Sequence, residues 1–143
     1  MVLSNLRNLY IKTYYQQTEL PYCNFIFMEI TTIANRLTEL CTAGNFPQAQ
    51  KELYNEDIVS IEVDGSRLEG LPTLLAKEQS FLDSLEKINL VEFSQPLIAG
   101  NYFTVKLTMD INIRNIGQRR VEELCVYQVA EGKIVFEQFF RNR

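Results

Sequence analysis

The sequence predicts an α+β domain whose helices pack on one face of an antiparallel sheet. Helical spacing of apolar residues is confined to the part of the chain before about residue 85. Beyond that point apolar and polar residues largely alternate, which is typical of strands. With 143 residues, 46% of them apolar, the chain is long enough for one domain with its own core.

Three helices are expected, and apolar residues at three- and four-residue spacing identify the first: Ile30, Ile33, Leu37, Leu40 and Cys41. Thr31 or Thr32 is suited to capping its start, and Gly44 to ending it in a left-handed conformation. A short second helix over residues 47–54 and a third over residues 72–85 each open on a proline, which fits a first helical turn.

Strands are expected over five segments: residues 58–63, 87–99, 102–113, 119–129 and 134–141. The alternation is clearest in 102–113, and Pro96 is expected to bend 87–99. Residues 23–27 are expected to form a short edge strand. They fall in an N-terminal extension, residues 1–28, ahead of a domain that covers residues 29–143.

The residue types present narrow the chemistry. The chain has no histidine, which excludes Ser-His-Asp and Cys-His catalysis and histidine-bound zinc. Cys23, Cys41 and Cys125 are widely spaced and are expected to be reduced thiols of a cytoplasmic protein. No metal or other cofactor is expected.

Charge and hydropathy argue against two kinds of partner. The net charge is −4 and no dense Lys/Arg patch occurs, so nucleic acid is not expected. No apolar run reaches the ~20 residues of a membrane span. Residues 1–27 also lack the continuous apolar core of a signal peptide, so no membrane association is expected.

The last two expected strands carry apolar residues on both faces. The helices can cover only one face of the sheet. The other face is therefore a candidate subunit interface, most simply in a two-fold homodimer.

Three segments carry a family resemblance. Residues 35–65, NRLTELCTAGNFPQAQKELYNEDIVSIEVDG, contain a helix, a Gly-Asn-Phe break, a short helix, a Leu-Tyr-x-x-Asp exit and a strand ending near glycine. Residues 70–81, GLPTLLAKEQSF, form a glycine-led helix, and residues 132–140, GKIVFEQFF, a closing strand. In this order and spacing they resemble the SnoaL-like proteins of the nuclear-transport-factor-2-like superfamily, over about residues 29–141.

The resemblance implies a cone-shaped, cystatin-like α+β roll in which three N-terminal helices pack on a strongly curved antiparallel sheet around a small-molecule pocket. It also implies a homodimer. The superfamily includes ketosteroid isomerase, scytalone dehydratase, limonene epoxide hydrolase, SnoaL polyketide cyclases and nuclear transport factor 2, so the fold does not specify the reaction.

Position by position, the resemblance to ketosteroid isomerase is partial. Glu62 falls where that enzyme has its base carboxylate. Cys125 and Leu37 fall where it has an oxyanion-hole aspartic acid and tyrosine. Because only one of three positions keeps its chemistry, ketosteroid isomerase activity is not expected. SnoaL-type cyclases generally rely on a histidine and an aspartate, and the absence of histidine weakens that assignment too.

Strand parity counted from Cys125 directs one set of side chains into the expected pocket. The candidate catalytic residues are Glu62, Glu123, Glu137 and Tyr127. The candidate pocket residues are Phe103, Val105, Leu107, Cys125, Phe139 and Arg141. Several carboxylates in an apolar pocket cannot all ionise, so one should have a pKa raised toward neutrality and serve as an acid–base group. Tyr127 could donate a hydrogen bond to a developing oxyanion.

Structural roles remain open for the same residues. Glu62 could be solvated at a strand end, and Glu123 could pair with Arg119 or Arg120. Arg141 could neutralise Glu137 through a bidentate pair. Tyr127 could be a core tyrosine, and the three glutamates could bind a divalent cation.

Three functions fit these observations. The first is a cofactor-free isomerase, cyclase or dehydratase that acts on a small apolar carbonyl compound. The second is a non-catalytic protein that binds a ligand in the same pocket. The third is a protein-interaction module, which predicts a pocket filled with side chains.

Overall fold

The computed structural model describes residues 21–142, with side chains from Glu29 onward. Within this part the helices are α2 (Pro21–Thr42), α3 (Phe46–Leu53) and α4 (Leu71–Ser84). The strands are β1 (Tyr54–Ile61), β2 (Arg67–Glu69), β3 (Leu85–Phe93), β4 (Leu97–Ala99), β5 (Tyr102–Ile113), β6 (Gly117–Ala130) and β7 (Lys133–Phe140). The α+β prediction is confirmed, and β5 has the bounds that its alternation predicts.

The sheet is mixed and open rather than purely antiparallel. Its strands follow the order β2-β1-β7-β6-β5-β3, with β4 also paired to β5. β1 runs parallel to β7, whereas the other pairs are antiparallel. The antiparallel prediction is therefore wrong at this pair. The relative direction of two strands far apart in sequence depends on the connection between them, which local patterning does not report.

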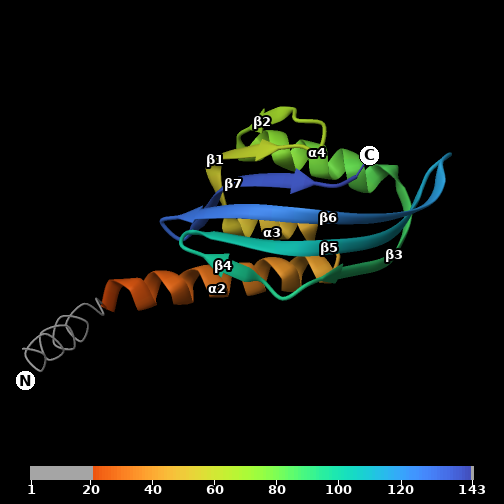
Figure 1. The fold of residues 1–143 in the computed structure, drawn as a ribbon. Helices are drawn as coiled ribbons and strands as arrows, with labels where there is room; N and C mark the ends of the chain where they lie inside the picture. Colours follow the sequence, from red (N-terminus) through yellow and green to blue (C-terminus); the bar gives the residue numbers. More distant parts are fainter. Residues whose placement is uncertain (1–20, 143) are drawn as a thin grey trace, which may run out of the picture.

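The helices are not all N-terminal, because α4 lies between β2 and β3. α2 packs near β3 and β5, and α4 near β1 and β2 (Figure 1). Leu37 of α2, Leu74 of α4 and Phe103 of β5 belong to one continuous buried cluster. The helices thus cover one face of the sheet.

The edge strand expected at residues 23–27 is wrong, because these residues lie in α2. A five-residue segment is too short to distinguish a strand from a helix by periodicity. Thr31 and Thr32 consequently lie inside the helix and do not cap it. The helix continues across residue 28, the expected end of an N-terminal extension; residues 1–20 of that extension lie outside the described residues.

Gly44 ends α2 as expected. Its φ is +79°, its N–H donates to the Cys41 carbonyl at 3.0 Å, and the Asn45 N–H donates to the Leu40 carbonyl at 2.9 Å. These two bonds form a Schellman motif, which needs a left-handed residue at this place.

A β-bulge between β6 and β7 decides which side chains face the helices. Val129 pairs with Ile134, but Gln128 pairs with Phe136, so Val135 is an extra residue in β7. The bulge reverses the alternation of β7 after Ile134. Glu137 therefore points to the same side as the buried Ile134, whereas Phe136 points to the other.

The opposite face of the sheet keeps apolar side chains exposed. Leu124 and Phe140, which are cross-strand partners, are 46% and 47% exposed. Val126 and Phe136 lie half-buried on the same face. No helix of the described part covers this face.

Candidate functional site

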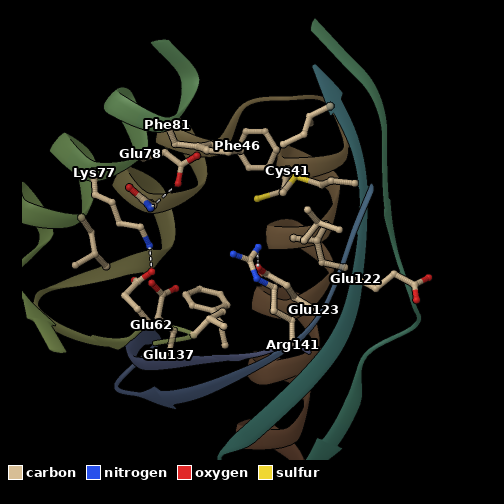
Figure 2. Close-up of a pocket in the computed structure, with 18 of the residues that line it drawn as sticks. Cys41, Phe46, Glu62, Lys77, Glu78, Phe81, Glu122, Glu123, Glu137 and Arg141 are labelled. Carbon is tan, nitrogen blue, oxygen red and sulfur yellow. Dashed lines mark hydrogen bonds and ion pairs between the residues drawn. The ribbon is translucent and has the colours of Figure 1, made fainter. Parts of the chain in front are cut away.

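A cavity of about 1280 Å³ lies between the helices and the inward face of the sheet (Figure 2). Aromatic residues from four elements contribute to its wall: Phe46, Phe81, Phe93 and Phe139. Arg119, Arg120 and Glu122 line its exposed rim, so the cavity opens to solvent.

Glu137 is the most buried acidic residue of the cavity, at 2% exposure. The bulge in β7 turns it inward, and the Tyr54 hydroxyl donates to its Oε2 at 2.5 Å. Burial raises the pKa of Glu137 to about 7, although the hydrogen bonds from Tyr54 and Ser60 oppose the shift. A carboxyl group of this kind is present in both protonation states at neutral pH.

Glu62 also lies on the cavity wall, in the turn that follows β1. Its Oε1 accepts a hydrogen bond from Ser60 Oγ at 3.1 Å, and its Oε2 forms an ion pair with Lys77 Nζ at 2.5 Å. Lys77 Nζ also lies 5.5 Å from the centroid of the Phe139 ring, at cation–π distance. Glu62 is therefore held by two side-chain partners on the cavity wall and is not simply solvated at a strand end.

Glu123 faces the cavity from β6 and pairs with Arg141, whose Nη1 lies 3.0 Å from Glu123 Oε1. Burial raises the pKa of Glu123, and the charge of Arg141 opposes this. Arg141 thus neutralises Glu123 and not Glu137. The alternative pairing of Glu123 with Arg119 or Arg120 is not observed among the described residues.

Tyr127 lines the cavity but is packed as an aromatic core residue. Its ring stacks on Phe103 with 4.8 Å between centroids, and meets the edge of Phe139 at 6.4 Å. Burial raises the pKa of the phenol well above 10, so it remains a hydrogen-bond donor.

Three of the expected pocket residues line the cavity, namely Leu107, Phe139 and Arg141. The other three, Phe103, Val105 and Cys125, are buried in the core behind it and are not part of its wall. Burial raises the pKa of the Cys125 thiol to about 12, so it carries no nucleophilic thiolate at neutral pH.

A second polar group lies on the helical wall. Gln50 of α3 donates from Nε2 to Oε2 of Glu78 of α4, at a long 3.5 Å. Burial raises the pKa of Glu78. Cys41 of α2 lies on the same wall and is a free, buried thiol.

Sequence reasoning missed four of these residues, Gln50, Tyr54, Lys77 and Glu78. A local signal existed for three of them. Lys77 and Glu78 fall three and four residues after Leu74 on its helix, and Gln50 falls four residues after Phe46. Tyr54 directly follows α3 and begins β1, and only the packing of β1 beside β7 brings its hydroxyl to Glu137.

Among residues 29–142, no three acidic or cysteine side chains are grouped closely enough to hold a metal ion. In the same described part, no helix is long and apolar enough to cross a membrane.

The fold and its cavity define a class of α+β proteins in which helices and an open mixed sheet form a largely apolar pocket with a few polar side chains on its wall. The model of the SnoaL-like domain matches residues 28–141. The chain therefore belongs to the SnoaL-like domain family.

Solved structures agree with this assignment. A candidate SnoaL-like polyketide cyclase from Mesorhizobium loti is 25% identical, with a TM-score of 0.73 over 78% of this chain and 98% of that one. A protein of ketosteroid isomerase-like fold from Catenulispora acidiphila, solved with trimethylamine, is 16% identical, with a TM-score of 0.65 over 77% of this chain and 85% of that one. A candidate polyketide cyclase from Xanthomonas campestris is 13% identical, with a TM-score of 0.66 over 80% and 91%. A search of curated proteins finds no match.

Proposed function

We propose that this protein binds a small, largely apolar carbonyl compound and converts it without a cofactor, by isomerisation, cyclisation or dehydration. The observation that carries the proposal is Glu137, a buried carboxyl group with a pKa of about 7 on the wall of a largely apolar cavity. A group that is half ionised at neutral pH can both accept and return a proton. Likeness to the Mesorhizobium loti protein, a candidate polyketide cyclase, supports the same substrate class.

In the proposed step, the Glu137 carboxylate takes a proton from the carbon next to the substrate carbonyl. The C–H electron pair moves into the carbonyl group, which becomes an enolate. Glu137 then returns the proton to the same or another carbon. The Tyr54 hydroxyl holds Oε2 of Glu137 and fixes the position of the carboxyl group.

The neighbouring groups have supporting roles in this proposal. Tyr127 is a protonated phenol on the wall and would turn its hydroxyl from Cys125 to donate to the enolate oxygen. Glu62 and Glu123 form ion pairs with Lys77 and Arg141, which leaves Glu137 as the acid–base group of this proposal.

The proposal is tested by following exchange of the α-hydrogens of small ketones and β-diketones for deuterium in D₂O by NMR. Glu137→Gln keeps the size and the hydrogen bond from Tyr54 but cannot take a proton. The variant should exchange about 10²- to 10⁴-fold more slowly, which is the usual contribution of one acid–base group. Glu86→Gln, an exposed position on β3, is the matched control and should exchange like the original protein. Equal rates for the original protein and Glu137→Gln would refute the acid–base step.

A non-catalytic binding protein is the second candidate, favoured by the ion pairs that already occupy Glu62 and Glu123. It predicts that the same ketones raise the melting temperature without any exchange. The third candidate, an interaction module with a filled pocket, is not supported, because the cavity is open and lined by polar groups.

We also propose that two copies of a cytoplasmic protein pair through the exposed face of the sheet. The apolar pair Leu124 and Phe140 supports this, because side chains of this size are usually covered. Light scattering at micromolar concentration should give twice the chain mass, and Leu124→Asp should give the monomer mass. A monomer mass for the unchanged protein would contradict the pairing.

A further inference from the structure

A buried hydrogen-bond acceptor on the helical wall of the cavity, the side-chain oxygen of Gln50, has no donor in the described part of the chain. Gln50 is 8% exposed and lines the cavity. Its Nε2 donates to Glu78, but its Oε1 has no hydrogen-bond partner among the described residues. Leaving a buried carbonyl oxygen unpaired costs about 1–3 kcal/mol. The oxygen has less than 1 Å² of exposed surface, so a ligand can donate to it once the Gln50 side chain turns toward the cavity.

Glu78 is also less satisfied than the other acidic residues of the cavity. Glu62 has Lys77, Glu123 has Arg141, and Glu137 has the Tyr54 hydroxyl. Within residues 29–142, Glu78 forms no ion pair, and its hydrogen bond from Gln50 is at the long limit of 3.5 Å.

The surroundings of this pair differ from those of Glu137. Phe81 and Phe46 lie near Glu78, whereas Glu137 lies next to Glu62, beyond Lys77 (Figure 2). A ligand could thus occupy both places at once, with one polar end at each.

We propose that Gln50 and Glu78 together bind the protonated amino group of the ligand. An ammonium group carries three hydrogens, so it can donate to Gln50 Oε1 and to the Glu78 carboxylate at the same time. A hydroxyl group has one hydrogen and can satisfy only one of these acceptors. A carboxylate has none and would be repelled by Glu78.

The inference deepens the proposed function and rests on it. It narrows the substrate class to small carbonyl compounds that carry a primary amine away from the reacting carbon. Phe46 and Phe81 would contact the apolar part next to the amine.

The test compares four probes of similar size by calorimetry or by NMR titration: hexylamine, hexan-1-ol, hexanoate and cyclohexanone. Hexylamine should bind at least about tenfold more tightly than hexan-1-ol, a difference that one charge-assisted hydrogen bond can supply. Glu78→Gln keeps the shape and removes the charge, and Gln50→Leu removes the acceptor. Each should reduce hexylamine affinity about tenfold and leave cyclohexanone affinity unchanged. Glu86→Gln controls for the general attraction of an amine to an acidic protein, and circular dichroism verifies that each variant is folded.

Each other outcome decides a separate point. Equal binding of hexylamine and hexan-1-ol, or stronger binding of hexanoate, would overturn the amine site. If cyclohexanone binds and hexylamine shows no preference, only this inference fails and the proposed function stands. If no probe binds, both fail.

Discussion

The free energy of unfolding of this protein should fall as the pH rises, and replacing Glu137 with glutamine should remove a large part of that fall. Burial raises the pKa of Glu137 to about 7 in the folded state, while the unfolded chain has the ordinary value of 4.5. Between these values the folded protein holds one proton more than the unfolded chain. Its free energy of unfolding therefore falls as the pH rises, by about 1.4 kcal/mol per pH unit.

The size of the effect follows from the two pKa values. The stability contribution is fully present below the unfolded pKa and is lost as the pH rises through the folded pKa, in total about 3 kcal/mol. Between about pH 5.5 and 8.5 the loss is about 2 kcal/mol. Glutamine is neutral throughout, so the difference between variant and original protein should shift by this amount in favour of the variant.

The assay is urea unfolding followed by circular dichroism across that pH range. Glu78 and Glu123, whose pKa values burial also raises, are present in both proteins and cancel in the comparison. Glu86→Gln should run parallel to the original protein because the side chain is exposed. Parallel profiles for Glu137→Gln and the original protein would mean that Glu137 titrates normally, and the acid–base proposal would lose its basis.

Three further predictions concern other contacts. Tyr54→Phe removes the donor to Glu137, so the pKa of Glu137 should rise further and unfolding in urea at about pH 8 should show a loss of about 1–3 kcal/mol; unchanged stability would mean that the hydrogen bond contributes little. Ile134→Ala, at a side chain with 0% exposure, should cost about 2–5 kcal/mol, whereas Leu97→Ala, at 70% exposure, should stay within about 0.5 kcal/mol; similar losses in the same assay would contradict the burial. Gly44→Ala should lower stability by about 1–2 kcal/mol, because alanine is strained in the left-handed backbone conformation of this residue. Steric contact does not add to this cost, since nothing lies within 4 Å of the added methyl group. An unchanged melting temperature would show that α2 ends differently.

The elements that sequence reasoning identified well are those with a strong local pattern. The bounds of β5 follow from twelve alternating residues, and the end of α2 follows from Gly44. Both signals depend only on neighbours in the chain, since alternation and left-handed backbone are local properties. The same reasoning failed at residues 23–27, because so short a segment shows no distinctive period.

The candidate site divides in the same way. Counting alternate residues from Cys125 correctly predicted that Glu123 and Tyr127 face the cavity, because β6 alternates without interruption over that stretch. Ile134 and Glu137 share a face only because Val135 is bulged out of register, and that bulge exists in the pairing with β6 and not in β7 alone.

By itself, the sequence determined the α+β class, most element boundaries and a set of acidic residues that could line a pocket. The tertiary structure decided the partner of each carboxyl group, because Lys77, Arg141 and Tyr54 reach Glu62, Glu123 and Glu137 across large sequence separations. It also decided that β1 runs parallel to β7 and that Gln50 meets Glu78. The physical reason is that burial and hydrogen-bond partners set the state of a titratable group, and both come from packing between elements rather than from neighbours along the chain.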